Sequence, residues 1–107
     1  MATTVSRTPA GANRSRVTVV ALRGELDAAA LDSLVETFDD AIGQDDSDVV
    51  VDLAEVEFIG AAWIGTLVRR RASLHTQDRE LTVRAPSHVV NRLLELCGLS
   101  YLIEATP

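Results

Sequence analysis

Short runs of β-branched residues alternate along this chain with segments in which apolar residues recur at helical spacing. Residues 17–22 read Val-Thr-Val-Val-Ala-Leu, and residues 49–51 are three consecutive valines, which is typical of strands covered on both faces. After each run, apolar residues recur every three or four positions, which predicts amphipathic helices. Alternating strands and helices predict an α/β fold with helices packed on a sheet.

Three helices are predicted from this spacing and from residues that can cap them. The first helix starts after Asp27, a candidate N-cap, and ends at Gly43. The second starts in the small-residue turn at 60–65, and the third starts after the candidate cap Ser87 and ends at Gly98. On the third helix the residues expected to point inward are Val90, Leu93, Leu94 and Cys97.

Further short strands are predicted near the two ends of the chain. Residues 81–83 are expected to form a strand, and residues 101–103 a last one. Residues 1–16 form either a loose tail or an edge strand that includes residues 3–7. The sheet is therefore predicted to be mixed, with four to five strands, in one domain of 107 residues.

The charge of the chain limits its partners. The chain has sixteen acidic residues and ten basic ones, all of them arginine, which gives a formal net charge of −6. Three of the arginines lie in the acid-free residues 1–16, so the rest of the chain carries seven arginines against sixteen acids, a net charge of −9. Such a body repels phosphate backbones and anionic membranes, which argues against nucleic acid and membrane as partners and favours a protein or a small molecule.

Residues with catalytic or metal-binding chemistry are scarce. A single cysteine, Cys97, excludes an internal disulfide and a multi-cysteine metal site; we expect it in the core, with an intermolecular disulfide as the alternative. His88 lies nine residues before it, on the opposite face of the predicted helix, so the two cannot act as nucleophile and base. We therefore expect no enzymatic activity, cofactor or metal.

The hydropathy of the chain bears on its location. No apolar run reaches about 18 residues, the length that a membrane span needs, and the start of the chain has no apolar segment typical of a secretion signal. The chain is therefore expected to be cytoplasmic.

Four motifs occur in an order that resembles a known family. Gly-Glu-Leu-Asp at 24–27 follows a predicted strand, residues 49–52 form the next one, Phe-Ile at 58–59 leads into the small-residue turn, and residues 90–99 read Val-Asn-Arg-Leu-Leu-Glu-Leu-Cys-Gly-Leu. Together they resemble a STAS domain, the fold of bacterial anti-sigma factor antagonists and of the cytoplasmic tails of sulphate transporters. The resemblance covers residues 17–103, and residues 17–107 are the expected STAS domain.

The resemblance implies a role in transcription regulation. Antagonists of this family bind an anti-sigma factor of the kinase type and so free the sigma factor, and the kinase reverses this by phosphorylating a serine in an Asp-Ser-Ser/Thr-Gly-Leu-Gly motif. In this chain Gly60 aligns with the family's aspartate, Ala61 with the acceptor serine, Ala62 with the next Ser/Thr and Trp63 with the glycine. The resemblance therefore predicts an antagonist-like, non-enzymatic protein that is not switched by phosphorylation at this position.

The partner surface implied by the resemblance contains Glu25, Asp27, Gly60, Ala61, Ala62 and Trp63. Asp27 has a second interpretation as a helix cap, and Trp63 either is half exposed as an interface anchor or folds over the sheet edge as a core residue.

Two further alternatives remain open. Phosphorylation could have moved to Thr66 or Ser73 on the second helix. The chain could instead be a STAS scaffold or sensory subunit that associates with itself, with other STAS proteins or with a small ligand.

Overall fold

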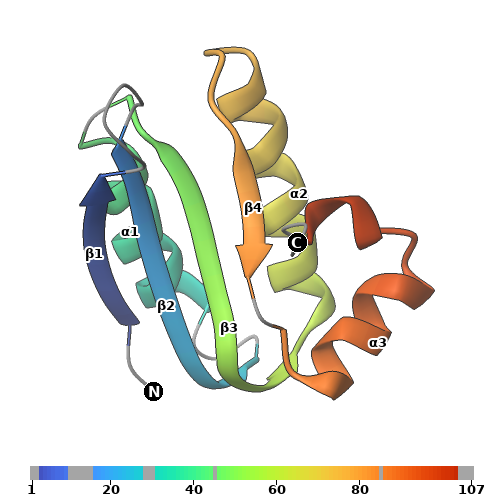
Figure 1. The fold of residues 1–107 in the computed structure, drawn as a ribbon. Coiled ribbons are helices and arrows are strands. Elements are labelled where there is room, and N and C mark those ends of the chain that lie inside the picture. The colour runs from blue at the N-terminus through green and yellow to red at the C-terminus, as the bar shows by residue number, and fades with distance from the viewer. Residues whose placement is uncertain (1–2, 10–15, 28–30, 45, 85, 104–107) are drawn as a thin grey trace.

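The computed structural model describes residues 3–9, 16–27, 31–44, 46–84 and 86–103 (Figure 1). Its strands are β1 (Thr3–Pro9), β2 (Arg16–Leu26), β3 (Asp48–Ile59) and β4 (Leu81–Arg84). Its helices are α1 (Leu31–Ile42), α2 (Ala61–His75), α3 (His88–Leu96) and the short 3₁₀ helix η2 (Ser100–Leu102).

The sheet is mixed, as the sequence predicts. Its strand order is β1-β2-β3-β4, with β1 antiparallel to β2 and the other neighbours parallel. Helices α1 and α2 lie behind the sheet in Figure 1, and α3 lies beside its lower end. Over the described residues this is the expected α/β fold, with four strands in one sheet.

The predicted strand at 101–103 is wrong. Residues Ser100–Leu102 form the 3₁₀ helix η2, and within the described ranges Ile103 makes a single parallel bridge with Val83. The amides of Leu102 and Ile103 donate to the carbonyls of Leu99 and Ser100 at 3.0 and 3.1 Å. These local bonds occupy amide groups that a strand would use in a ladder, and the turn they form lets Leu102 reach the core.

The valine runs lie in the core. Val20 of β2, Val51 of β3 and Val83 of β4 are neighbours in the parallel register and are fully buried. Val49 and Val50 are buried as well, which confirms that this part of β3 is covered on both faces.

Helix α3 ends as predicted, but Cys97 does not lie in the core. The amides of Gly98 and Leu99 donate to the carbonyls of Glu95 and Leu94, and Gly98 has a positive φ of 72°, which is a Schellman ending. Cys97 is the C-cap residue, and it lies with the exposed Leu96 at an end of α3 that the core does not cover. The prediction that Cys97 is a core residue is therefore wrong.

An ion pair joins α1 to α2. The Nε and Nη2 of Arg70 donate to the two carboxylate oxygens of Asp39 at 2.6 and 2.9 Å. This hydrogen-bonded pairing raises the pKa of Arg70 above its usual value, while burial acts in the opposite direction. The side chains are 30% and 43% exposed, so solvent screens the attraction.

We expect Asp39→Ala to lower the free energy of unfolding by only about 0.5–1 kcal/mol, because the pair is partly exposed. A double-mutant cycle with Arg70→Ala, measured by urea unfolding, isolates the coupling between the two side chains. The coupling should decrease as salt is added. A coupling that salt leaves unchanged would contradict the electrostatic origin of the effect.

Candidate protein-interaction site

The ends of two parallel strands bring the predicted partner residues together. Glu25 is the register partner of Phe58, and Leu26 that of Ile59, so β2 and β3 finish at the same edge of the sheet. The amide of Gly60 donates to the carbonyl of Leu26 at 2.9 Å, and α2 begins at the next residue. The Gly-Glu-Leu-Asp motif and the small-residue turn are therefore adjacent in space.

Gly60 starts α2 without a side-chain cap. Its backbone is extended, with φ −81° and ψ 163°, and its carbonyl accepts from the amides of Trp63 and Ile64 at 3.0 and 3.1 Å. A Cβ atom at this position would lie 3.3 Å from the carbonyl oxygen of Leu26. A glycine at this position thus lets α2 begin close against the end of β2.

The surface at this edge is formed by small and acidic residues together with one aromatic ring. Glu25, Asp27, Ala61 and Ala62 are exposed, and Gly60 is half-buried. Phe58 is 46% exposed and lies opposite Glu25 in the sheet. The sequence analysis missed Phe58 as a surface residue, because an aromatic residue at a strand end usually packs into the core.

Trp63 is not part of this surface. Its side chain has 0% exposure and belongs to the hydrophobic core, so the interpretation as a half-exposed interface anchor is wrong and the packing alternative is right. The inward stripe of α2 consists of Trp63, Thr66, Leu67 and Leu74, whereas Ile64 and Val68 are only partly buried. The apolar spacing of the sequence predicts an inward stripe of Ile64, Leu67, Val68 and Ala72, so the helix is rotated relative to that prediction. The Trp63 Nε1 has no hydrogen-bond partner within the described part of the chain.

The two alternative acceptor hydroxyls lie in different surroundings. Thr66 is 2% exposed, and its hydroxyl donates to the carbonyl of Ala62 at 2.9 Å. Ser73 is exposed, but it lies near the opposite end of α2. Neither hydroxyl therefore occupies the surface formed by Ala61 and Ala62.

The structural interpretation of Asp27 as a helix cap stays a prediction. Residues 28–30, which would connect Asp27 to α1, lie outside the described residues. The Asp27 side chain is exposed at the end of β2.

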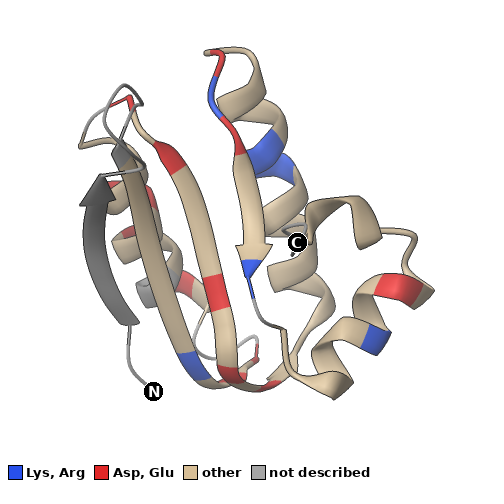
Figure 2. Cartoon of the chain, in the orientation of Figure 1, with Lys and Arg blue, Asp and Glu red and all other residues tan. Residues whose placement is uncertain are grey.

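The described residues contain no group of three or more His, Cys, Asp and Glu side chains that could hold a metal ion. Over the same residues, no helix combines the length and the apolar character needed to cross a bilayer. Figure 2 shows acidic residues spaced along β3 and basic ones on α2 and β4.

Comparisons with known proteins agree with this architecture. The family model described as "Mlab, STAS domain" matches residues 11–104. The anti-sigma factor antagonist SpoIIAA in its unphosphorylated form is similar, with a TM-score of 0.77 and 20% identity over 98% of this chain and 89% of that one. The Bacillus cell fate determinant SpoIIAA in the phosphorylated form has a TM-score of 0.66 and 18% identity over 98% and 92%. At such identities the likeness shows a shared fold.

Proposed function

Since the chain belongs to the STAS domain family, we propose that it is a non-enzymatic anti-sigma factor antagonist that binds an anti-sigma factor of the kinase type. The solved structures with the same fold include an anti-sigma factor antagonist, and this supports the proposal. Its place of action would be the cytoplasm, in transcription regulation.

The observation that carries the proposal is the surface at the start of α2. Exposed Ala61 and Ala62 lie beside Glu25 and Phe58, at the edge where β2 and β3 both end. Small exposed side chains next to an exposed aromatic ring suit contact with a protein, because the backbone of the partner can approach closely and cover the ring.

The same surface would have no phosphorylation switch. A phosphoserine adds about −1.5 to −2 charges and three acceptor oxygens, and the side chain of Ala61 can carry neither. Thr66 is buried, and Ser73 lies twelve residues along α2 from Ala61, which is roughly 18 Å of helix. The binding surface would therefore stay in one charge state.

The first test is capture of partners from the native cytoplasm, with identification of the bound proteins by mass spectrometry. Recovery of an ATPase that resembles a histidine kinase is the expected result. Incubation of the purified pair with ATP should then leave the mass of this chain unchanged. A phosphate on Ser73 or Thr66 that weakens binding would contradict the absence of a switch.

We expect Ala61→Glu to weaken binding to that ATPase at least about tenfold, because it places a negative charge where the family carries its phosphate. A carboxylate in the first turn of α2 is favourable to the helix, so the fold should be retained. Ala72→Glu is the matched control, since Ala72 is exposed on the same helix but away from the surface. Calorimetric titration gives both affinities, and equal binding by Ala61→Glu and the wild type would contradict the proposed surface.

The same capture also tests the alternative function. Recovery of other STAS proteins alone, or of further copies of this chain, would favour a scaffold or sensory subunit over an antagonist.

A further inference from the structure

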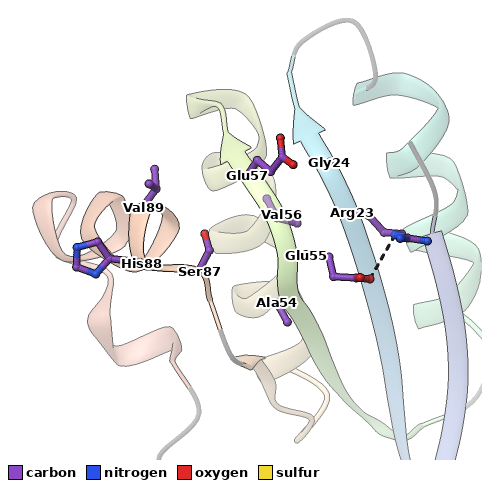
Figure 3. Close-up of a pocket in the computed structure, with 9 residues that line it drawn as sticks. All are labelled: Arg23, Gly24, Ala54, Glu55, Val56, Glu57, Ser87, His88 and Val89. Atoms are coloured by element: carbon purple, nitrogen blue, oxygen red, sulfur yellow. Dashed lines mark ion pairs between the residues drawn. The ribbon is translucent and has the colours of Figure 1, made fainter.

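A groove of about 880 Å³ lies between β3 and the start of α3 (Figure 3). Residues 23–24 of β2, 54–57 of β3 and 87–89 at the start of α3 line it. None of the six residues assigned above to the partner surface lines this groove.

The groove exists because β4 is short. Leu81–Arg84 pairs only with the first part of β3, from Val49 to Asp52, whereas β3 continues to Ile59. Pro86 follows and has no amide hydrogen to extend the ladder. Among the described residues, no strand therefore pairs with residues 53–59 of β3 on the side of α3. The groove lies where β4 would run if it were longer.

The shape of the groove favours a peptide over a small molecule. Its volume is within the range of roughly 300–1,000 Å³ that is typical of ligand pockets, but such pockets bury most of their ligand. Here Ala54, Glu57, His88 and Val89 are all exposed, so the groove is open along its length. An extended segment can lie in an open groove and place alternate side chains on its floor.

The charges of the groove favour a basic occupant. Glu57 lines the groove, is exposed, and has no ion pair or hydrogen bond to a side chain within the described part of the chain. Glu55 pairs with Arg23 at 3.3 Å, but both side chains are more than half exposed, and such a pair is weak and easily exchanged. An Arg or Lys of a partner would meet the carboxylate of Glu57 and that of Glu55, which can exchange Arg23 for the new partner.

The groove also has an apolar wall. Val89 is 53% exposed at the start of α3 and lines the groove on the side opposite β3 (Figure 3). Burial of this side chain and of an aliphatic side chain from the partner would add hydrophobic free energy to the charge attraction. The register between β2 and β3 shifts twice in this region, so side-chain contacts rather than a regular ladder would supply most of the affinity.

We propose that this groove docks an extended segment of a protein partner in which an Arg or Lys lies close to an aliphatic residue. The basic side chain contacts Glu57, and the aliphatic side chain packs on Val89. The proposal does not depend on binding of an anti-sigma factor, because none of its residues belongs to the surface of Ala61 and Ala62.

The test uses a random peptide library displayed on phage, selected against the whole chain. Enriched peptides are expected to carry Arg or Lys near an aliphatic residue, and calorimetry on the synthesised peptides gives their affinities. Glu57→Arg should weaken binding at least about tenfold, and Glu57→Gln by less. Glu36→Arg is the matched control, since Glu36 is exposed on α1 and the change in net charge is the same.

Three results would overturn the proposal: no enrichment, enrichment of peptides without basic residues, or equal binding by Glu57→Arg and the wild type. Retained far-ultraviolet circular dichroism shows that each variant is folded. Ala61→Glu should leave peptide binding unchanged, so failure of the groove and failure of the proposed function give different results.

Discussion

Replacement of Trp63 by alanine is expected to lower the free energy of unfolding by about 3–5 kcal/mol. The indole is fully buried and is the largest of the fully buried side chains, so its removal leaves a cavity that the surrounding side chains fill only in part. Small domains are stable by only about 5–15 kcal/mol, so this single change would remove a large part of the total. Urea unfolding followed by far-ultraviolet circular dichroism measures the loss without requiring tryptophan fluorescence.

Trp63→Phe is the control that separates packing from hydrogen bonding. It keeps an aromatic ring and removes the Nε1 donor, which is buried without a partner among the described residues. An unpaired buried donor costs about 1–3 kcal/mol, so its removal offsets part of the lost packing. The phenylalanine variant should therefore lose less than half as much stability as the alanine variant. Equal losses would contradict this account and show that the indole N–H has a partner in solution.

Arg79→Ala is expected to have the second largest effect, a loss of about 2–4 kcal/mol. Arg79 is 6% exposed, and its Nε and Nη2 donate to the carbonyls of Ser47 and Ile42 at 2.9 and 2.8 Å. Its Nη1 donates to the side-chain oxygen of Gln77 at 3.2 Å. One guanidinium thus joins the end of α1 to the residue before β3 and to the turn after α2, and its removal breaks all three hydrogen bonds at once.

The position of the cation adds to this effect. Ile42 is the last residue of α1, where the helix dipole places partial negative charge that favours a positive group. Arg79→Lys keeps the charge, but a single ammonium group cannot reach all three acceptors. We therefore expect a loss of stability between that of Arg79→Ala and none. Arg92→Ala, on the exposed side of α3, should change stability by less than about 0.5 kcal/mol. Full rescue by lysine would show that charge alone, and not the geometry of the guanidinium, is responsible.

Much of the fold could be predicted from local patterns. The valine runs predicted the buried parallel strands, and Gly98 predicted the Schellman ending of α3, because both depend on backbone geometry within a few residues. The strand at 101–103 could not be distinguished from a short 3₁₀ turn, since three residues carry too little periodicity to decide.

The candidate site was predictable only in part. Glu25 and Ala61 lie close together because two parallel strands end at one edge of the sheet, and the resemblance to the STAS family had implied that they share one surface. The exposure of Phe58 and the buried position of Arg79 were not expected. Phenylalanine is usually buried and arginine usually exposed, so both positions contradict the preference of the residue type. Both depend on neighbours that are distant in the sequence.

The sequence by itself determined the alternation of strands and helices and the absence of a hydroxyl at Ala61, because these depend on the order and identity of residues alone. The tertiary structure decided which way α2 is turned, and so buried Trp63. It also left Cys97 exposed at the end of α3, and it decided how far β4 runs beside β3, which opens the groove. These three outcomes result from the packing of elements against one another, where a rotation of one residue or a difference of a few residues in length changes which side chains meet the solvent.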